Sequence, residues 1–136
     1  MPRIRVAVIG AGGISSQHCP VLVALDEIDL VAVVEPRADR LSAALVKFGV
    51  PNGFGSIDDL LEWGEFDAAW VLVSHVATSE VAERFIRLGV PTFIEKPPGI
   101  YPEQTECLVR AVEETATVTQ VGLNRRFYTS TRAALA

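Results

Sequence analysis

The fold of this chain is decided by one stretch near its start, IRVAVIGAGGIS, residues 4–15. Its first half is rich in Val and Ile and ends at Gly10, which is typical of a buried parallel strand that enters a tight turn. Gly12 lets a phosphate approach the backbone without a Cβ in the way. A helix that follows directly points N–H groups and the positive end of its dipole at that anion. The stretch therefore predicts a pyrophosphate-binding turn.

The turn departs from the G-x-G-x-x-G pattern at one position. Ser15 stands where the third glycine is usual. Since that glycine allows a helix to pack closely on its strand, we expect the packing here to tolerate a hydroxymethyl group. A purely structural turn in another α/β domain is the alternative to dinucleotide binding.

Strand-like and helical patterns alternate along the whole chain. Apolar, β-branched runs predict strands at 4–9, 30–35, 52–54, 67–74, 91–95 and 117–122. Amphipathic stretches between them predict helices, and we expect the first to bury Ile14, Val21, Leu22 and Leu25. Such alternation specifies an α/β protein with three layers, a parallel sheet with helices on both faces. Right-handed crossovers make the doubly wound Rossmann fold, with strand order 3-2-1-4-5-6, the simplest topology.

The composition excludes several classes of protein. The 136 residues are 49% apolar and 21% charged, which suits one globular domain with a single core. A net charge of -5 argues against binding nucleic acid, which requires a clustered basic surface. No apolar run approaches the ~20 residues that span a membrane. Cys19 and Cys107 lie far apart and lack metal-ligand spacing, so we expect reduced thiols, no metal site and a cytoplasmic location.

An acidic residue closes the second predicted strand. Glu35 is in the place where a carboxylate can accept hydrogen bonds from the ribose hydroxyls of an adenosine. Its charge would repel a 2′-phosphate, which favours NAD over NADP. Arg37 and Arg40 leave NADP open, because either arginine can pair with that phosphate. A solvated strand end is the alternative interpretation of Glu35.

A lysine follows the fifth predicted strand, at the sheet edge where ligands bind in open α/β folds. Lys96, in the run Glu95-Lys96-Pro97-Pro98, can place a positive charge and a proton donor beside a reacting oxygen. Taken alone, such a lysine is more often a surface charge. His75, in the loop after the fourth strand, has no partner in the sequence that would favour a catalytic role.

Together these motifs resemble the glucose-fructose oxidoreductase/inositol dehydrogenase/MocA family. The resemblance rests on the glycine turn followed by His18, on Glu35-Pro36, on the segment 122–127 and above all on Glu95-Lys96-Pro97. It implies an NAD(P)-dependent oxidoreductase that transfers a hydride between nicotinamide and a hydroxyl- or keto-bearing carbon, commonly of a sugar or cyclitol. The resemblance also makes Lys96 the catalytic candidate, and in that family the Lys-Pro bond is often cis.

The motifs and the resemblance give one expected set of cofactor contacts. It comprises Gly10, Gly12, Gly13, Ile14, Glu35, Arg37, Ser74, Glu95, Lys96 and Arg126. One departure concerns the loop after the fourth strand, where the family often has Thr-Pro-Asn-x-x-His. This chain has SHVATS at 74–79, in which only Ser74 can stand for the threonine.

The resemblance also sets expectations for domain organisation. We expect 1–122 to form the dinucleotide-binding domain and 123–136 to begin the connection to an absent second domain. In similar proteins that domain supplies the general base, the substrate pocket and a dimer-forming sheet. A sugar-like small molecule and a second copy of the protein are the expected partners, and the isolated chain is expected to be inactive. The alternatives are a complete, non-catalytic dinucleotide-binding module, acting as a sensor or regulatory partner, and a structural domain without cofactor.

Overall fold

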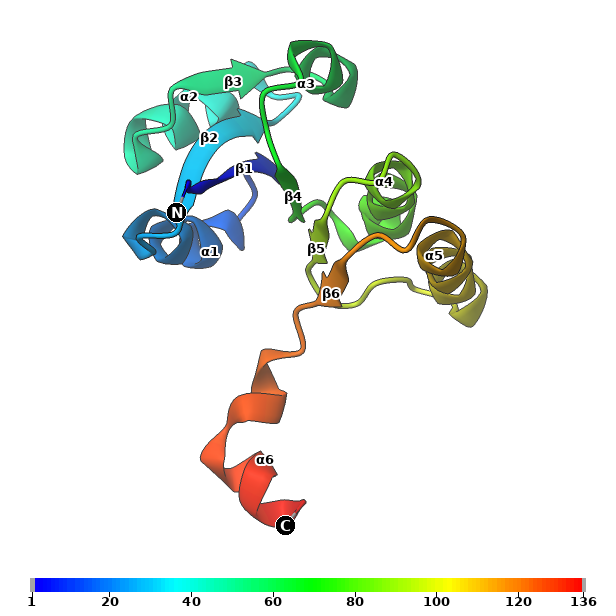
Figure 1. Ribbon diagram of the computed structural model, residues 1–136. Helices are drawn as coiled ribbons and strands as arrows, with labels where there is room; N and C mark the ends of the chain where they lie inside the picture. The colour runs from blue at the N-terminus through cyan, green and yellow to red at the C-terminus, as the bar shows by residue number, and fades with distance from the viewer. Residues whose placement is uncertain (1, 136) are drawn as a thin grey trace.

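The computed structural model describes residues 2–135 and shows a six-stranded parallel sheet between two layers of helices (Figure 1). The strands are β1 (Ile4–Ile9), β2 (Ile28–Val34), β3 (Asn52–Phe54), β4 (Ala68–Val71), β5 (Thr92–Ile94) and β6 (Thr119–Val121). Their order across the sheet is β3-β2-β1-β4-β5-β6, so the predicted doubly wound topology is confirmed. The winding reverses between β1 and β4, the place where open α/β sheets bind ligands.

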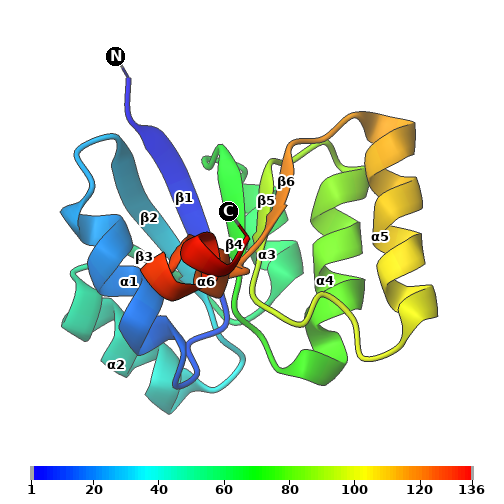
Figure 2. The same ribbon diagram turned by 90° about the horizontal axis from the view of Figure 1, so that it is seen from below.

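Helices cover both faces of the sheet. They are α1 (Ser15–Ala24), α2 (Ala38–Phe48), α3 (Ile57–Trp63), α4 (His75–Arg87) and α5 (Pro102–Thr115). One core lies between the sheet and α3, α4 and α5, around Leu60, Phe85 and Leu108. The other lies between the sheet and α1 and α2, around Cys19 and Leu22. Figure 2 shows α1 and α2 on one side of the strands and α4 and α5 on the other.

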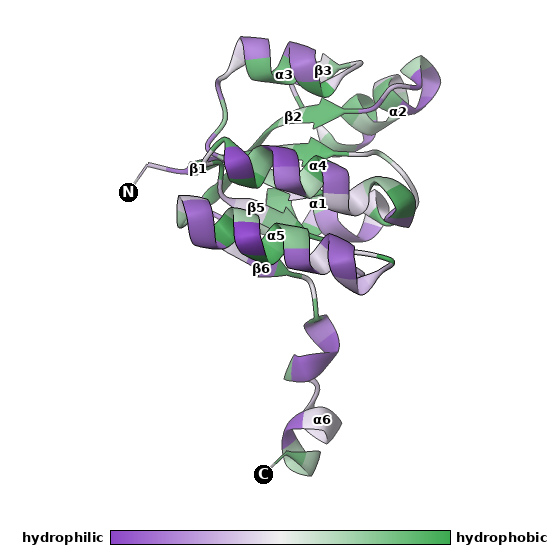
Figure 3. Cartoon of the chain, turned by 90° about the vertical axis from the view of Figure 1, so that its right-hand side faces the viewer, coloured by the Kyte–Doolittle hydropathy of each residue, from purple (hydrophilic) through white to green (hydrophobic). Residues whose placement is uncertain are grey.

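The central strand β1 is buried on both sides, which explains its uninterrupted apolar run. Ala7 and Ile9 contribute to the core under α3, α4 and α5. Val6 and Val8 contribute to the core under α1 and α2. Since successive strand residues point to opposite faces, both sets must be apolar. The outward faces of α4 and α5, in contrast, are largely hydrophilic (Figure 3).

Two local expectations are wrong. Val21 on α1 and Leu25, its C-cap, are 59% and 43% exposed, and the buried residues of that helix are Ser15, Cys19 and Leu22. Their three- and four-residue spacing still marks a helix face, but two of its three side chains are small ones that hydropathy does not single out. The predicted strand 67–74 is also too long, because β4 ends at Val71 and Ser74 is already the N-cap of α4.

Beyond β6 the chain leaves the sheet as an arm (Figures 1 and 3). The arm consists of a short 3₁₀ helix, η1 (Asn124–Phe127), and α6 (Thr129–Ala134), neither of which contains a buried residue. Phe127 and Tyr128 are 65% and 53% exposed. Across residues 2–135, the helices are too short or too polar to cross a membrane.

Candidate functional site

The glycines of the turn between β1 and α1 serve two different purposes. Gly10 has φ +101°, and a Cβ there would lie 2.7 Å from the carbonyl oxygen of Leu72, so the fold itself requires glycine. A Cβ on Gly12 or Gly13 would meet nothing within 4 Å, and neither residue has a positive φ. Neither backbone conformation nor packing therefore demands glycine at these two positions. Their missing side chains leave open space at the start of α1, where an anion can approach the backbone.

Ser15, in the place of the third glycine, is accommodated by a hydrogen bond. The residue is buried, and its Oγ–H donates to the carbonyl oxygen of Gly12 over 2.6 Å. The hydroxyl therefore joins the first turn of α1 to the glycine turn. The expected tolerance for a hydroxymethyl group is confirmed.

Glu35 is held against the glycine turn at the end of β2. The residue is only 7% exposed. Its Oε2 atom accepts a hydrogen bond from the backbone N–H of Ala11 at 3.0 Å, and its Oε1 atom accepts one from the N–H of Arg37 at 3.1 Å. Burial and two backbone donors rule out a solvated strand end. Each carboxylate oxygen retains capacity for a further hydrogen bond.

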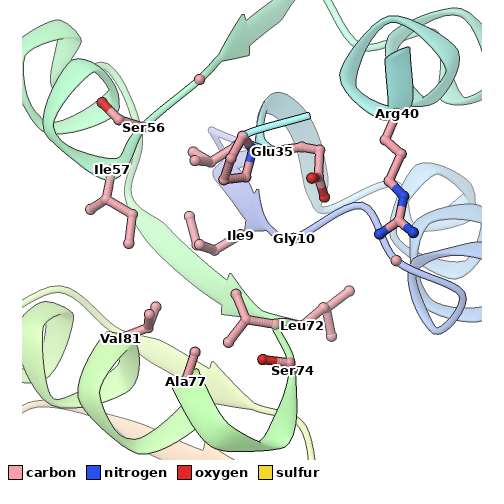
Figure 4. Close-up of a pocket in the computed structure, with 15 residues that line it drawn as sticks. Ile9, Gly10, Glu35, Arg40, Ser56, Ile57, Leu72, Ser74, Ala77 and Val81 are labelled. Carbon is pink, nitrogen blue, oxygen red and sulfur yellow. The ribbon is translucent and has the colours of Figure 1, made fainter. Parts of the chain in front are cut away.

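The structure separates the two arginines that follow β2. The guanidinium of Arg37 is paired with Asp39, with 2.8 Å between Nη2 and Oδ2. Arg37 thus contributes to the site through its backbone N–H, which donates to the Glu35 carboxylate. Arg40, which the expected set of contacts omitted, extends from α2 towards the glycine turn beside Glu35 (Figure 4).

A cavity of about 500 Å³ lies at this edge of the sheet. One part of its wall is polar and includes Glu35, Arg40 and Ser74, while Ile57 and Val81 belong to an apolar part (Figure 4). The apolar members were not predictable, because their sequence pattern is the same as that of core residues on α3 and α4. A partly apolar cavity that also contains a carboxylate and the glycine turn suits a purine base followed by its ribose and phosphates.

A second cavity, of about 440 Å³, lies on the other side of the turn and includes Ile14, Glu95 and Lys96 in its wall. Lys96 also lines a neighbouring hollow of about 330 Å³ together with Arg126. The side chain of Lys96 is exposed, and the Lys96–Pro97 peptide bond is cis, as the family resemblance implied. His75 begins α4 and is exposed.

Three side chains from distant parts of the sequence meet beside the second cavity, and two of them, His18 and Glu95, line its wall. The Nε1 atom of Trp70 on β4 lies 3.2 Å from Nδ1 of His18 on α1. The Nε2 atom of His18 lies 3.1 Å from Oε2 of Glu95 after β5. The sequence drew attention to His18 only as part of a motif, and it gave no signal for Trp70.

The predicted contacts therefore gather at one edge of the sheet, apart from the Arg37 side chain. Gly10, Gly12, Glu35 and Ser74 line the first cavity, and Ile14, Glu95 and Lys96 line the second. Gly13 lines a shallower hollow between α1 and α2, together with Arg40 and Lys47. Within residues 2–135, no three His, Cys, Asp or Glu side chains are grouped so that they could hold a metal ion.

A doubly wound sheet with a glycine turn after β1 and a buried acid at the end of β2 defines a dinucleotide-binding Rossmann domain. The chain belongs to the glucose-fructose oxidoreductase/inositol dehydrogenase/MocA family. Residues 4–123 match the model of that family, described as "Oxidoreductase family, NAD-binding Rossmann fold".

Several inositol dehydrogenases are similar to the chain. Myo-inositol dehydrogenase Hyg17 of Streptomyces leeuwenhoekii is 36% identical over 126 residues, which are 91% of the chain and 38% of the relative. Myo-inositol 2-dehydrogenase of Thermotoga maritima is 28% identical over 124 residues, which cover 91% of the chain and 37% of that relative. The crystal structure of scyllo-inositol dehydrogenase from Lactobacillus casei with bound NAD(H) and scyllo-inositol matches with a TM-score of 0.88 and 25% identity, over 97% of the chain and 39% of that structure. The chain spans about two-fifths of the length of these relatives.

Proposed function

We propose that this chain is the cofactor-holding part of an oxidoreductase that moves a hydride between NAD and a hydroxyl- or keto-bearing carbon of a cyclitol or sugar. The observation that carries the proposal is the placing of two cavities on either side of one glycine turn. The first cavity contains Glu35 and the second contains Lys96. Family membership and the cyclitol substrates in the names of its relatives support the substrate class.

The first cavity suits the adenosine end of the cofactor. Glu35 would accept hydrogen bonds from the ribose hydroxyls with the capacity its oxygens retain. Gly12 and Gly13 would let the pyrophosphate approach the backbone at the start of α1. Ile57 and Val81 would contact the two faces of the adenine, since they belong to the apolar part of the wall.

NAD is the preferred cofactor in this proposal. A buried Glu35 held by two backbone N–H groups cannot turn away from a 2′-phosphate, so its carboxylate disfavours NADP. Arg40 lines the same cavity and is the side chain placed to pair with such a phosphate. Arg40 would therefore allow residual NADP binding rather than create a preference for it.

Lys96 is the proposed catalytic residue. When bound, NAD supplies the carbon that gives or accepts the hydride. The Lys96 side chain is exposed on the wall of two adjoining hollows, so its Nζ can donate a hydrogen bond to the oxygen on the reacting carbon of a substrate. A positive donor at that oxygen stabilises the charge that develops there as the hydride moves.

The remaining parts of the site would come from outside these residues. In this proposal a second domain supplies the general base, the rest of the substrate pocket and the contacts for self-association. We also infer a cytoplasmic location, supported by two cysteines that are both free. A non-catalytic dinucleotide-binding module is the second candidate, favoured by the two cavities that residues 2–135 form by themselves.

Titration of the chain with NADH, followed by nicotinamide fluorescence, tests cofactor binding directly. Saturable binding that is tighter for NADH than for NADPH is expected, and no binding of either would overturn the proposal. Reading the gene beyond codon 136 separates the enzyme from the module, since an enzyme needs about 150 or more further residues. In such a longer protein, Lys96→Met should reduce hydride transfer by about 100-fold or more.

A further inference from the structure

Trp70, His18 and Glu95 form a continuous chain of hydrogen bonds, called here the tryptophan–histidine–glutamate array. It connects β4, α1 and the end of β5, three elements that are far apart in sequence. The His18 and Glu95 side chains are only 22% and 14% exposed. The array ends at Glu95, whose neighbour in the chain is the proposed catalytic Lys96.

The donor at one end of the array fixes the tautomer of the histidine. An indole N–H can only donate, so His18 Nδ1 must accept from Trp70. The proton of a neutral imidazole is then on Nε2, which donates to Oε2 of Glu95. The opposite tautomer would set a donor against the indole N–H and a lone pair against the carboxylate. Only the neutral Nε2–H form satisfies both neighbours.

Aromatic packing holds the array in one orientation. The Trp70 ring stacks on Phe93 with 4.1 Å between centroids and an interplanar angle of 9°. The His18 ring lies 5.6 Å from the same phenyl ring. A Cβ on Gly122 would lie 2.7 Å from Cζ of Phe93 and 3.1 Å from Oε2 of Glu95. Glycine at this position therefore avoids a steric clash with the phenyl ring and the carboxylate. The Glu95 carboxylate is thereby held by His18, whose ring is in turn held by Trp70 and Phe93.

We propose that His18 is a positioning residue for the nicotinamide end of the site. By holding Glu95, it fixes the segment that carries Lys96 along the wall of the second cavity, and Trp70 sets the histidine tautomer for this task. This inference rests on the proposed placement of the nicotinamide in that cavity. The adenosine cavity has a different set of lining residues, so the array acts on one half of the cofactor only.

The test compares two ligands that differ in the nicotinamide. NADH and ADP-ribose, which lacks the nicotinamide, are titrated into the chain and into His18→Leu, Trp70→Phe and His18→Gln. His18→Leu removes the donor to Glu95 and should weaken NADH about 10-fold, the effect of one lost charge-assisted hydrogen bond, while ADP-ribose binding is unchanged. His18→Gln retains an amide donor and should recover part of the NADH affinity. Trp70→Phe should show a smaller loss of the same kind.

Equal weakening of NADH and ADP-ribose by His18→Leu would overturn the positioning role, because a general structural defect affects both ligands. Nitrogen-15 NMR of the unaltered chain gives an independent test that needs no variant. The Nε2–H tautomer at His18 is expected, and an Nδ1–H tautomer would also overturn the inference. Failure of the unaltered chain to bind either ligand would instead count against the proposed function itself.

Discussion

The Glu35 carboxylate lies directly against the glycine turn, with its Oε2 atom 3.0 Å from the backbone nitrogen of Ala11. One buried side chain therefore supports the turn and faces the position proposed for the ribose. The acid and the turn form one unit, although 24 residues separate them in the sequence. The proposed preference for NAD over NADP depends on this unit.

Glu35→Ala should weaken NADH binding by about 10- to 100-fold, because charge-assisted hydrogen bonds to the ribose are lost. NADPH binding should weaken much less or improve, since the repulsion of the 2′-phosphate disappears. Calorimetric titration of both cofactors measures the ratio of their affinities. Glu113→Ala, at an exposed position on α5, is the matched control and should leave both affinities unchanged. An unaltered NADH-to-NADPH ratio in Glu35→Ala would contradict the proposed ribose contact.

Arg40 and Arg37 should behave differently despite their closeness in sequence. Arg40→Ala should reduce residual NADPH affinity by about 10-fold, the effect of one lost pairing between a guanidinium and a phosphate, with little change for NADH. Arg37→Ala should affect neither cofactor, because the Arg37 guanidinium is paired with Asp39 outside the cavity. The same titrations measure both variants. If Arg37→Ala proved the more damaging for NADPH, the assignment of these two side chains would be wrong.

Features with a local signal were predictable from the sequence. Strand β1, the turn at Gly10 and the acid at Glu35 are each marked by residue type and spacing, and the alternation of elements determined the sheet order. The partners of His18 were not predictable, because Trp70 and Glu95 lie 52 and 77 residues away. Contacts at that separation depend on how the strands are arranged, which no local pattern records.

Two further details depended on tertiary structure. Arg37 and Arg40 are equivalent as sequence signals, and they are separated by the ion pair of Arg37 with Asp39 and by the place of Arg40 in the cavity wall. In the first helix, hydropathy predicted burial of Val21 and Leu25, whereas the structure buries the less hydrophobic Ser15 and Cys19. Hydropathy alone therefore identified Leu22 but not the other two residues of the buried face.

Cys19 gives a prediction about alkaline stability. Burial raises the pKa of its thiol from 9.0 to about 11, an effect that the charge of Lys47 partly opposes. The unfolded chain therefore loses this proton first as the pH rises above 9, so the free energy of unfolding should fall between pH 9 and 11. Urea unfolding measures this free energy at pH 8 and at pH 10.5. Between these two values it should fall by about 1–2 kcal/mol more in the unaltered chain than in Cys19→Ala. Cys107→Ala is the control, and its free energy of unfolding should fall as much as that of the unaltered chain. If the free energy of Cys19→Ala fell by the same amount, the prediction would be contradicted.

The most direct measurement of the cofactor site compares NADH binding and thermal unfolding of the unaltered chain, Gly12→Ala and Gly10→Ala. A methyl group on Gly12 meets no protein atom within 4 Å, so Gly12→Ala should unfold at nearly the same temperature. It should nevertheless bind NADH about 10-fold more weakly or worse, because the methyl group occupies space next to the proposed pyrophosphate. Gly10→Ala should lose stability, since its Cβ would lie 2.7 Å from the Leu72 carbonyl oxygen. A stable Gly12→Ala chain that binds NADH as tightly as the unaltered one would contradict the role of the turn.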